Sequence, residues 1–374
     1  MRFTLSSTAL GNQLSVLSKV LNSKNSLPIL DCFLLEVAGN KLSITASDSE
    51  NTMKTTLPID ASDGDGKFAV SSSRLMDAVK ELPEQPLTVE VDTQALTVQM
   101  LYQNGVYNFM AQNADEYPVC QPLSQEATSL TLPSPTLAAN ISRSLFAVGT
   151  EELRPVMNGI YFDLTPEALA IVASDGHKLV RNRVYNVKTE SPSSFVLPKK
   201  PATLLRTALL KDEGDTVIRF DNRTAEITFG DTTLQSRLIE GRYPNYNAVI
   251  PEDNPYIITM DRKALLSVLR RVLPFSSESS HLVRMHIETG LMVLSSQDLD
   301  FASSAKEDIV CDYVGTSMNI GFMGNSLTDI LSSIASDDIK LELADPSRPC
   351  VILPGEQPEN EEVLMLLMPM LLND

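Results

Sequence analysis

Three stretches of the chain repeat one local pattern, and this repeat constrains the fold more than any other feature of the sequence. Each stretch opens with a short alternating segment: Phe-Thr-Leu at residues 3–5, Leu-Thr-Leu at 130–132 and Ile-Thr-Met at 258–260. Apolar residues at helical spacing follow each opening. The openings lie 130 − 3 = 127 and 258 − 130 = 128 residues apart. Such a period indicates successive copies of one domain.

Two further markers keep nearly the same register. Leu-Ser-Ile-Thr-Ala-Ser-Asp at 42–48 returns as Leu-Ala-Ile-Val-Ala-Ser-Asp at 169–175, and Tyr-Pro at 117–118 returns at 243–244. We therefore predict three homologous domains, at residues 1–124, 129–251 and 256–374. The length of 374 residues is enough for two to four domains of ordinary size.

Each predicted domain also repeats within itself. A short apolar segment such as Phe-Ala-Val at 68–70 leads into apolar residues spaced i, i+3, i+4 and i+7, which is typical of an amphipathic helix. Alternating stretches such as Leu-Thr-Val-Glu-Val at 87–91 predict antiparallel strands between the helices. The sequence thus predicts an α+β fold of six units, each one helix with a few strands. The helical windows are 8–21, 71–82, 134–149, 198–211, 261–273 and 324–336.

Charge is distributed unevenly between the predicted elements. The net charge is −18, yet the six helical windows together carry +8, which leaves −26 for the rest. Helices favour Lys and Arg by propensity alone, which is one explanation. Glu shares that propensity but is scarce in these windows, so the asymmetry favours a polyanion facing the helices.

Composition narrows the class of protein further. The chain is 43% hydrophobic and 21% charged, as in ordinary globular proteins, and no apolar run approaches the ~18 residues of a membrane span. The N-terminus lacks the pattern of a signal peptide. The four cysteines lie far apart without a CxxC pair, so we expect neither a zinc site nor disulfides, and a reducing cytoplasm.

The chain offers little that suggests catalysis. Ser174, Asp175 and His177 stand close in sequence, but no G-x-S-x-G elbow accompanies them, and a strand-end turn that supplies a binding surface is the better interpretation. The acidic run at 60–66 is similar to a calcium loop but has Ser71 in place of the final Glu, which favours a hairpin turn. His281 and His286 are off helical register with no third ligand. We expect no catalytic residue, no metal and no cofactor.

Four motifs in order closely resemble the bacterial sliding clamps, the beta subunits of DNA polymerase III. They are Leu-Pro-Ile-Leu at 27–30, Ala-Ser-Asp-Gly-His-Lys-Leu at 173–179, Glu-Gly-Arg-Tyr-Pro-Asn-Tyr at 240–246, and Met-Pro-Met at 368–370. The resemblance covers the whole chain, including its threefold repeat. It implies a head-to-tail homodimeric ring in which each chain forms half of a pseudo-sixfold ring, with helices lining the hole.

The resemblance also implies a function. Such a clamp is a processivity factor of DNA replication that encircles duplex DNA without reading its sequence. It is a non-catalytic subunit of the polymerase III holoenzyme in the cytoplasm, at the nucleoid. The implied partners are double-stranded DNA, a second copy, the replicative polymerase alpha subunit, the clamp loader, repair polymerases and ligase, the proteins binding through short linear motifs.

Three groups of site residues follow from this resemblance and from the helix charges. For DNA contact we expect Lys24, Arg74, Lys80, Lys199, Lys200 and Arg206. For a cleft that binds partner peptides we expect Arg154, Met157, Ser174, Gly176, His177, Lys178, Leu179, Pro244, Ala248, Val249, Leu366, Leu367, Met368, Pro369 and Met370. For the dimer interface we expect Tyr107, Phe109, Leu273 and Phe275. The chain departs from its relatives at Pro155-Val156, where they carry aromatics, and at Leu371, where they often carry Arg.

Two other interpretations of the sequence stay open. A repeat-built scaffold or carbohydrate-binding protein without nucleic acid would share the repeat, but not the basic helices or the four motifs. A hydrolase centred on His177 would need hydrogen bonds between His177, a serine and an acid.

Overall fold

A computed structural model gives the structure of the chain and describes residues 1–25, 27–118, 120 and 122–372. The chain forms two compact units, each made of two segments. Unit 1 consists of Met1–Ala138 with Thr203–Leu238, and unit 2 consists of Ala139–Ala202 with Ile239–Asp374.

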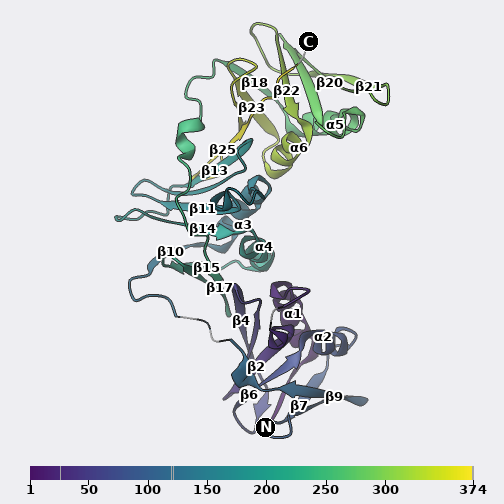
Figure 1. Cartoon of the computed structure of the whole chain (residues 1–374), viewed down its shortest axis with the longest axis vertical. Coiled ribbons are helices and arrows are strands. Elements are labelled where there is room, and N and C mark those ends of the chain that lie inside the picture. Colours follow the sequence, from purple (N-terminus) through teal and green to yellow (C-terminus); the bar gives the residue numbers. More distant parts are fainter. Residues whose placement is uncertain (26, 119, 121, 373–374) are drawn as a thin grey trace. The chain divides into compact units, whose positions relative to one another are not determined.

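Within the described residues, each α-helix begins directly after a strand (Figure 1). The pairs are β1 Arg2–Ser6 with α1 Ser7–Leu17, β6 Gly66–Ser71 with α2 Ser72–Lys80, β10 Thr128–Pro133 with α3 Ser134–Ser144, β14 Ser193–Pro198 with α4 Lys199–Ala208, β18 Tyr256–Asp261 with α5 Arg262–Val272, and β22 Met318–Met323 with α6 Gly324–Ser333. Side-chain caps start two of them: Ser6 Oγ accepts from the Ala9 amide (3.0 Å) and Asp261 Oδ1 from the Ala264 amide (2.6 Å). The predicted six-unit α+β plan is confirmed.

Unit 1 contains a thirteen-stranded sheet in the order β10-β15-β16-β17-β4-β3-β2-β6-β9-β8-β7-β1-β5. Its further strands are β2 Cys32–Ala38, β3 Lys41–Ser47, β4 Asn51–Pro58, β5 Ala61–Ser62, β7 Pro86–Asp92, β8 Thr97–Tyr102, β9 Gly105–Gln112, β15 Asp215–Phe220, β16 Thr224–Phe229 and β17 Thr232–Arg237. Helices α1 and α2 lie side by side (Figure 1). A Cβ at Gly11 of α1 would lie 3.3 Å from Val79 of α2, so the glycine permits this close approach.

Unit 2 contains an eight-stranded sheet, β14-β11-β12-β13-β25-β24-β23-β18, and a four-stranded sheet, β21-β20-β19-β22. Its further strands are β11 Gly159–Leu164, β12 Leu169–Ser174, β13 Lys178–Val184, β19 Leu282–Glu288, β20 Leu291–Asp298, β21 Ser303–Val310, β23 Asp338–Leu343, β24 Cys350–Pro354 and β25 Glu361–Leu367. Every residue of β12 is buried, as expected for a central strand covered on both faces.

The two units divide the predicted central domain between them. Strand β17 pairs with β4 of the first predicted domain, and β13 pairs with β25 of the third. Each half of the central segment therefore continues a neighbour's sheet through backbone hydrogen bonds. The domain boundaries at residues 124–129 and 251–256, which were predicted from the sequence repeat, stay a prediction. The compact units are a different division of the chain, because each unit contains whole hydrogen-bonded sheets.

Candidate functional site

A cavity of about 370 Å³ opens in unit 2, where the β12–β13 turn, the segment before β18 and the end of β25 meet. We call it the unit 2 cleft. Eleven of the predicted cleft residues line it: Arg154, Met157, Ser174, Gly176, His177, Lys178, Leu179, Pro244, Val249, Leu366 and Met368. Four further residues line it that the list of expected cleft residues left out: Tyr243, Asn245 and Tyr246, which belong to the 240–246 motif, and Pro349, which no motif marked. Side chains up to 214 positions apart in the chain (368 − 154) thus surround one space.

The β12–β13 turn is held by its own hydrogen bonds. The Asp175 carboxylate accepts from the amides of His177 and Lys178 (both 2.9 Å) and from Lys178 Nζ (2.6 Å). Ser174 Oγ donates to the Lys178 carbonyl (2.8 Å) and accepts from the Gly176 amide (3.1 Å). The turn therefore presents His177 at the rim with little freedom to rearrange.

Gly176 is required in this turn for two reasons. Its φ of +93° lies in the region that side-chain-bearing residues rarely adopt. A Cβ there would also lie 3.1 Å from Nη1 of Arg154, which in turn forms an ion pair with Glu151 (2.8 Å). The glycine thus lets the Arg154 guanidinium pack directly against the turn.

The hydrogen bonds of the turn argue against a catalytic triad. Ser174 Oγ donates to a backbone carbonyl, and Asp175 is engaged by Lys178 and two amides. Burial alone would raise the pKa of Asp175, but these hydrogen bonds outweigh it and lower the pKa below its ordinary value. Asp175 is thus a structural carboxylate, and the arrangement does not fit the hydrolase alternative.

Aromatic side chains form one wall of the cleft. The rings of Tyr161 and Tyr243 are stacked with centroids 4.5 Å apart, and Tyr246 meets Tyr161 edge-on at 6.2 Å. Tyr246 donates its hydroxyl to Asp163 Oδ2 (2.9 Å). Burial raises the pKa of both Tyr243 and Tyr246, so both stay neutral. The wall is an extension of the unit 2 core, in which both tyrosines pack with Leu179 and Leu366.

The end of β25 forms the other wall, and here the prediction needs correction. Leu366 lines the cavity, whereas Leu367 is buried away from its lining because successive strand residues point to opposite faces. The Met368 amide donates to the His177 carbonyl (2.8 Å), which keeps Met368 at the cleft, but the Met370 amide donates to Gly321 of β22 (2.8 Å). Leu367, Pro369, Met370 and the exposed Ala248 are therefore not lining residues.

A polar network ties the cleft to the sheet beside it. Arg181 of β13, only 7% exposed, donates to Asn247 Oδ1 (3.2 Å) and forms an ion pair with Glu362 of β25. Asn247 belongs to the 3₁₀ turn η7, Tyr246–Val249, which carries two cleft-lining residues. Tyr185 also donates its hydroxyl to Glu362 (2.5 Å). Arg181 thus connects a cleft wall to two central strands, a role that no sequence pattern indicated.

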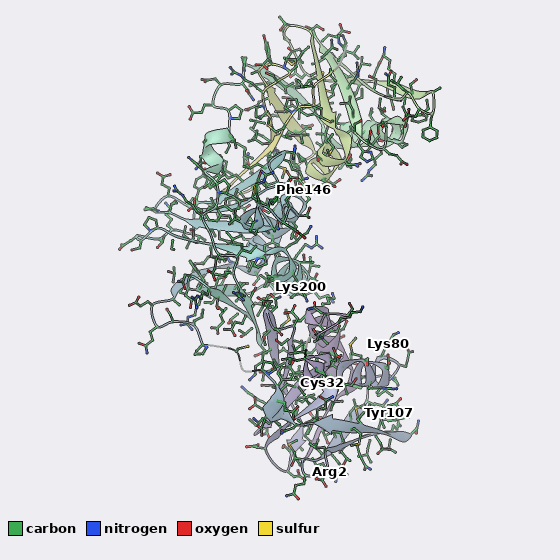
Figure 2. The ribbon with its side chains drawn as sticks, viewed as in Figure 1. Arg2, Cys32, Lys80, Tyr107, Phe146 and Lys200 are labelled. Carbon is green, nitrogen blue, oxygen red and sulfur yellow. The ribbon has the colours of Figure 1, made fainter. Side chains whose placement is uncertain are left out.

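The predicted DNA-contact residues lie on or beside helices in both units. Lys24, Arg74, Lys80 and Arg206 are exposed on unit 1, and Lys199 and Lys200 open α4 in unit 2. Figure 2 labels Lys80 at the end of α2 and Lys200 at the start of α4.

The charge count of the helices needs a second correction. Lys263 of α5 pairs with Asp337 (2.8 Å) and Arg271 with Glu307 (2.5 Å). Arg262 donates to the carbonyls of Leu331 and Ser336, and Arg143 of α3 pairs with Glu361. Each of these four cations lies against an acidic side chain or a backbone carbonyl of unit 2, so part of the positive charge counted on α3 and α5 is matched nearby.

The predicted dimer residues lie on or beside two strands that each have an unpaired edge. Tyr107 and Phe109 lie on β9, whose residues 105–110 pair with β8 on one side only, as far as the described residues show (Figure 2 labels Tyr107). Leu273 and Phe275 form the 3₁₀ turn η8, which packs against β21 at the edge of its sheet.

Other candidate sites are weak in the structure. Asp63 accepts from the Arg2 amide and Asp65 from the Gly39 amide, so these carboxylates of the acidic run bind backbone. Across the described ranges, no group of three or more His, Cys, Asp or Glu residues is placed to hold a metal ion. None of the helices in those ranges is long and apolar enough to span a membrane.

Comparisons with known proteins agree over nearly the whole chain. Models of the DNA polymerase III beta subunit match in order: its N-terminal domain at residues 1–121, its central domain at 131–245 and its C-terminal domain at 247–371. A beta sliding clamp of Pseudomonas putida is 26% identical over 372 residues, covering 99% of this chain and 100% of the relative.

Solved structures show the same similarity at the level of the fold. The DNA polymerase III subunit beta of Pseudomonas aeruginosa aligns with a TM-score of 0.93 at 23% identity. A sliding clamp of Bartonella birtlesii, solved bound to griselimycin, aligns with a TM-score of 0.90 at 25% identity. Both alignments cover 100% of each chain.

Proposed function

Because the chain belongs to the DNA polymerase III beta subunit family, we propose that it forms a ring around duplex DNA and holds partner proteins there through the unit 2 cleft. Membership makes it a DNA sliding clamp and a non-catalytic subunit. The observation that carries this function is the ordered match of all three domain models from residue 1 to 371. DNA and the polymerase are its partners in replication.

In this proposal two copies close head to tail, so that twelve helices surround the DNA. At roughly 8–10 Å between neighbouring helix axes, the ring of axes has a diameter of about 30–38 Å. Subtracting about 10 Å of helix thickness leaves roughly 20–28 Å, which admits a hydrated duplex. The unpaired edges of β9 and β21, with Tyr107, Phe109, Leu273 and Phe275 beside them, support these strands as the sites of closure.

A closed ring explains how a chain of net charge −18 can work on DNA. Topology retains it, so the phosphate contacts can stay weak enough for sliding. Lys24, Arg74, Lys80, Lys199, Lys200 and Arg206 are the proposed contacts. The acidic remainder of the surface discourages DNA from binding outside the ring.

The cleft suits short linear segments of several partners. Its apolar floor of Leu179 and Leu366 accepts aliphatic or aromatic anchors, and Met368 is flexible enough to repack around different ones. Arg154 and His177 offer polar contacts at the rim. We expect a segment with a Gln and a Leu-Phe-type pair to bind with micromolar affinity, about −8 kcal/mol. The replicative polymerase, the clamp loader, repair polymerases and ligase would then compete for one site.

Retention on closed circular DNA tests the ring. The chain, loaded onto a nicked plasmid by a clamp loader, should stay bound through gel filtration at high salt and leave once the plasmid is linearised. Equal retention on linear DNA with free ends would contradict the ring and favour ordinary charge-based binding.

A further inference from the structure

The turn between β3 and β4 in unit 1 repeats the hydrogen bonds of the β12–β13 turn, which bounds the unit 2 cleft. The two turns lie 127 residues apart (175 − 48), as the sequence repeat requires. Asp48 Oδ1 accepts from the amides of Glu50 (3.0 Å) and Asn51 (2.6 Å). Asp175 Oδ1 accepts from the two equivalent amides of unit 2 (both 2.9 Å). Ser49 has a φ of +80°, close to the +93° of the glycine in the unit 2 turn. Unit 1 therefore contains a second turn of the kind that supports the cleft.

The strand end beside each turn is held in the same way. The amide of Arg237, the last residue of β17, donates to the Glu50 carbonyl of the turn (2.9 Å). In unit 2 the amide of Met368 donates to the equivalent carbonyl (2.8 Å). A buried tyrosine of a Tyr-Pro pair lies beside each turn, Tyr117 in unit 1 and Tyr243 in unit 2. We call this second scaffold the unit 1 turn site and define it by Ser47–Thr52, Tyr117, Gln235 and Arg237.

The side chains on the floor of the two scaffolds differ. Strand pairing places Thr52 opposite Gln235 in unit 1. The equivalent pair in unit 2 is Leu179 opposite Leu366, which form the apolar floor of the cleft. An apolar anchor gains contact area against two leucines, whereas against a hydroxyl and an amide it must displace water from polar groups. The unit 1 floor is therefore a poor surface for an aliphatic or aromatic anchor.

The rim of the unit 1 turn site is charged. Arg237 Nη1 lies 3.8 Å from Glu50 Oε1, and both side chains are largely exposed. An apolar segment laid over this ion pair would take both charges out of water, which is costly. In unit 2 the same two positions carry Met368 and His177, and the methionine is apolar and flexible. The rim thus disfavours apolar segments in the same way as the floor.

We infer that the chain carries the scaffold of the peptide cleft twice, and that Thr52, Gln235 and Arg237 keep the unit 1 turn site closed to apolar segments. The inference rests on the proposed function of the unit 2 cleft and goes beyond it by naming the residues that distinguish the two copies. The backbone supplies both sites, and the side chains decide which one binds. Each chain therefore holds one partner segment rather than two, which is why partners compete.

A graft of the unit 2 side chains tests the inference. Thr52→Leu, Gln235→Leu and Arg237→Met, combined in the full-length chain, should raise the number of bound segments from one to two per chain. The probe is a synthetic peptide with a Gln and a Leu-Phe pair, titrated by calorimetry. The new site should bind about ten- to a hundredfold more weakly than unit 2, because Glu50 still stands at the rim.

A matched control separates this effect from general adhesion to apolar surface. Ser129→Leu, Thr131→Leu and Arg219→Met place three apolar side chains on exposed positions of β10 and β15, in the same sheet. This variant should bind one segment per chain, like the wild type. Both triple variants should unfold close to the wild-type temperature, because the substituted positions are not buried.

Two further variants assign the bound segments to their sites. When the graft is combined with removal of residues 368–374, one segment per chain should remain, bound at unit 1. In the otherwise wild-type chain, Leu366→Gln should weaken binding about a hundredfold, whereas Leu366→Met should keep it within about tenfold.

The number of segments bound by the wild type and by the graft decides between the outcomes. One segment per chain in the folded graft, or two in the wild type, would overturn the inference and leave the unit 2 cleft as the partner site. Unchanged affinity in Leu366→Gln would also overturn it, because the floor would then not select the ligand. A wild-type chain that binds no segment would instead overturn the proposed function of the cleft.

Discussion

Gly176 links a backbone requirement to the shape of the cleft. Its positive φ excludes a side chain, and so does the Arg154 guanidinium, which lies 3.1 Å from the place that a Cβ would take. We expect Gly176→Ala to destabilise the chain by about 1–2 kcal/mol through backbone strain and to weaken peptide binding by moving Arg154. Thermal unfolding and peptide titration measure the two effects.

Gly64→Ala is the matched control, because a Cβ there meets nothing within 4 Å. It should change neither quantity. Equal behaviour of the two variants would show that Gly176 does not shape the cleft.

Arg181 acts on the cleft through η7 rather than by lining it. Arg181→Met should weaken peptide binding several-fold and cost about 1–3 kcal/mol of stability. This is less than the ~3–5 kcal/mol for a fully buried pair, because Glu362 keeps some solvent contact. Adding Glu362→Gln should restore part of the stability, since it removes the carboxylate left unpaired. Arg219→Met, which breaks an exposed pair with Glu226, is the control. Unchanged peptide affinity in Arg181→Met would mean that η7 holds its position without the hydrogen bond from Arg181 to Asn247.

Because of Glu362, we expect the stability of unit 2 to decrease in acid. Burial alone would raise its pKa, but the hydrogen bond from Tyr185 and the charges of Arg181 and Arg183 outweigh it and lower the pKa. A depressed pKa adds stability that is present above the unfolded value of about 4.3 and is lost as pH falls through the folded value. When the pH is lowered past about 4, the unfolding temperature of the wild-type chain should therefore decrease. The decrease should be less steep in Glu362→Gln. Glu167→Gln, at an exposed position, should follow the wild-type curve.

At the scale of the helix, the basic residues are of two kinds: those that form an ion pair with an acidic side chain of the same chain, and those for which no such pair occurs among the described residues. Arg206 of α4 is exposed, and no ion pair of Arg206 occurs within the described ranges, whereas Arg271 of α5 is paired with Glu307. Arg206→Ala should weaken binding to linear duplex DNA. The slope of the logarithm of the binding constant against the logarithm of the salt concentration should become smaller by about one, as expected for the loss of one phosphate contact. Arg271→Ala should change both much less. The reverse order would place the DNA-facing charge on α5.

Two truncations at the end of β25 distinguish the residues needed for peptide binding from those needed for folding. Removing residues 368–374 takes away Met368 from the cleft but keeps the whole of β25 between β13 and β24. Peptide binding should be lost while dimerisation persists, as titration and sedimentation would show. Removing residues 361–374 should unfold unit 2, because buried Val363 and Met365 leave the sheet. Wild-type peptide affinity in the shorter truncation would contradict the cleft.

Periodicity predicted the helices well because each presents one apolar stripe to a sheet, as Leu10, Leu14 and Leu17 do on α1. The cleft could be anticipated only where motifs marked it. Pro349 was missed because nothing local distinguishes it from a loop proline. Arg143 and Arg271 were counted as surface charge because sequence does not show which acid a helix will meet.

At the scale of the whole molecule, the repeat predicted three similar domains but not where the compact units divide. A sequence repeat shows which segments are similar to one another. The division into compact units depends instead on the hydrogen bonds that join β17 to β4 and β13 to β25. These pairings join strands whose closest partners lie more than 175 positions apart (232 − 55 = 177), beyond the reach of any local pattern. For the same reason, side chains that neighbour each other at the cleft could not be paired from sequence spacing.

The central position of β25 has a consequence for biosynthesis. The ribosome makes β25 after every strand it pairs with, so β13 and β24 emerge with an open slot between them that only β25 can fill. A nascent chain stalled before residue 361 would expose buried apolar faces and two unpaired edges, which are hallmarks recognised by chaperones and proteases. The same chain would lack Leu366 and Met368, so it could not capture a partner. The chain can therefore bind a partner at the cleft only after β25 and the residues that follow it have been synthesised.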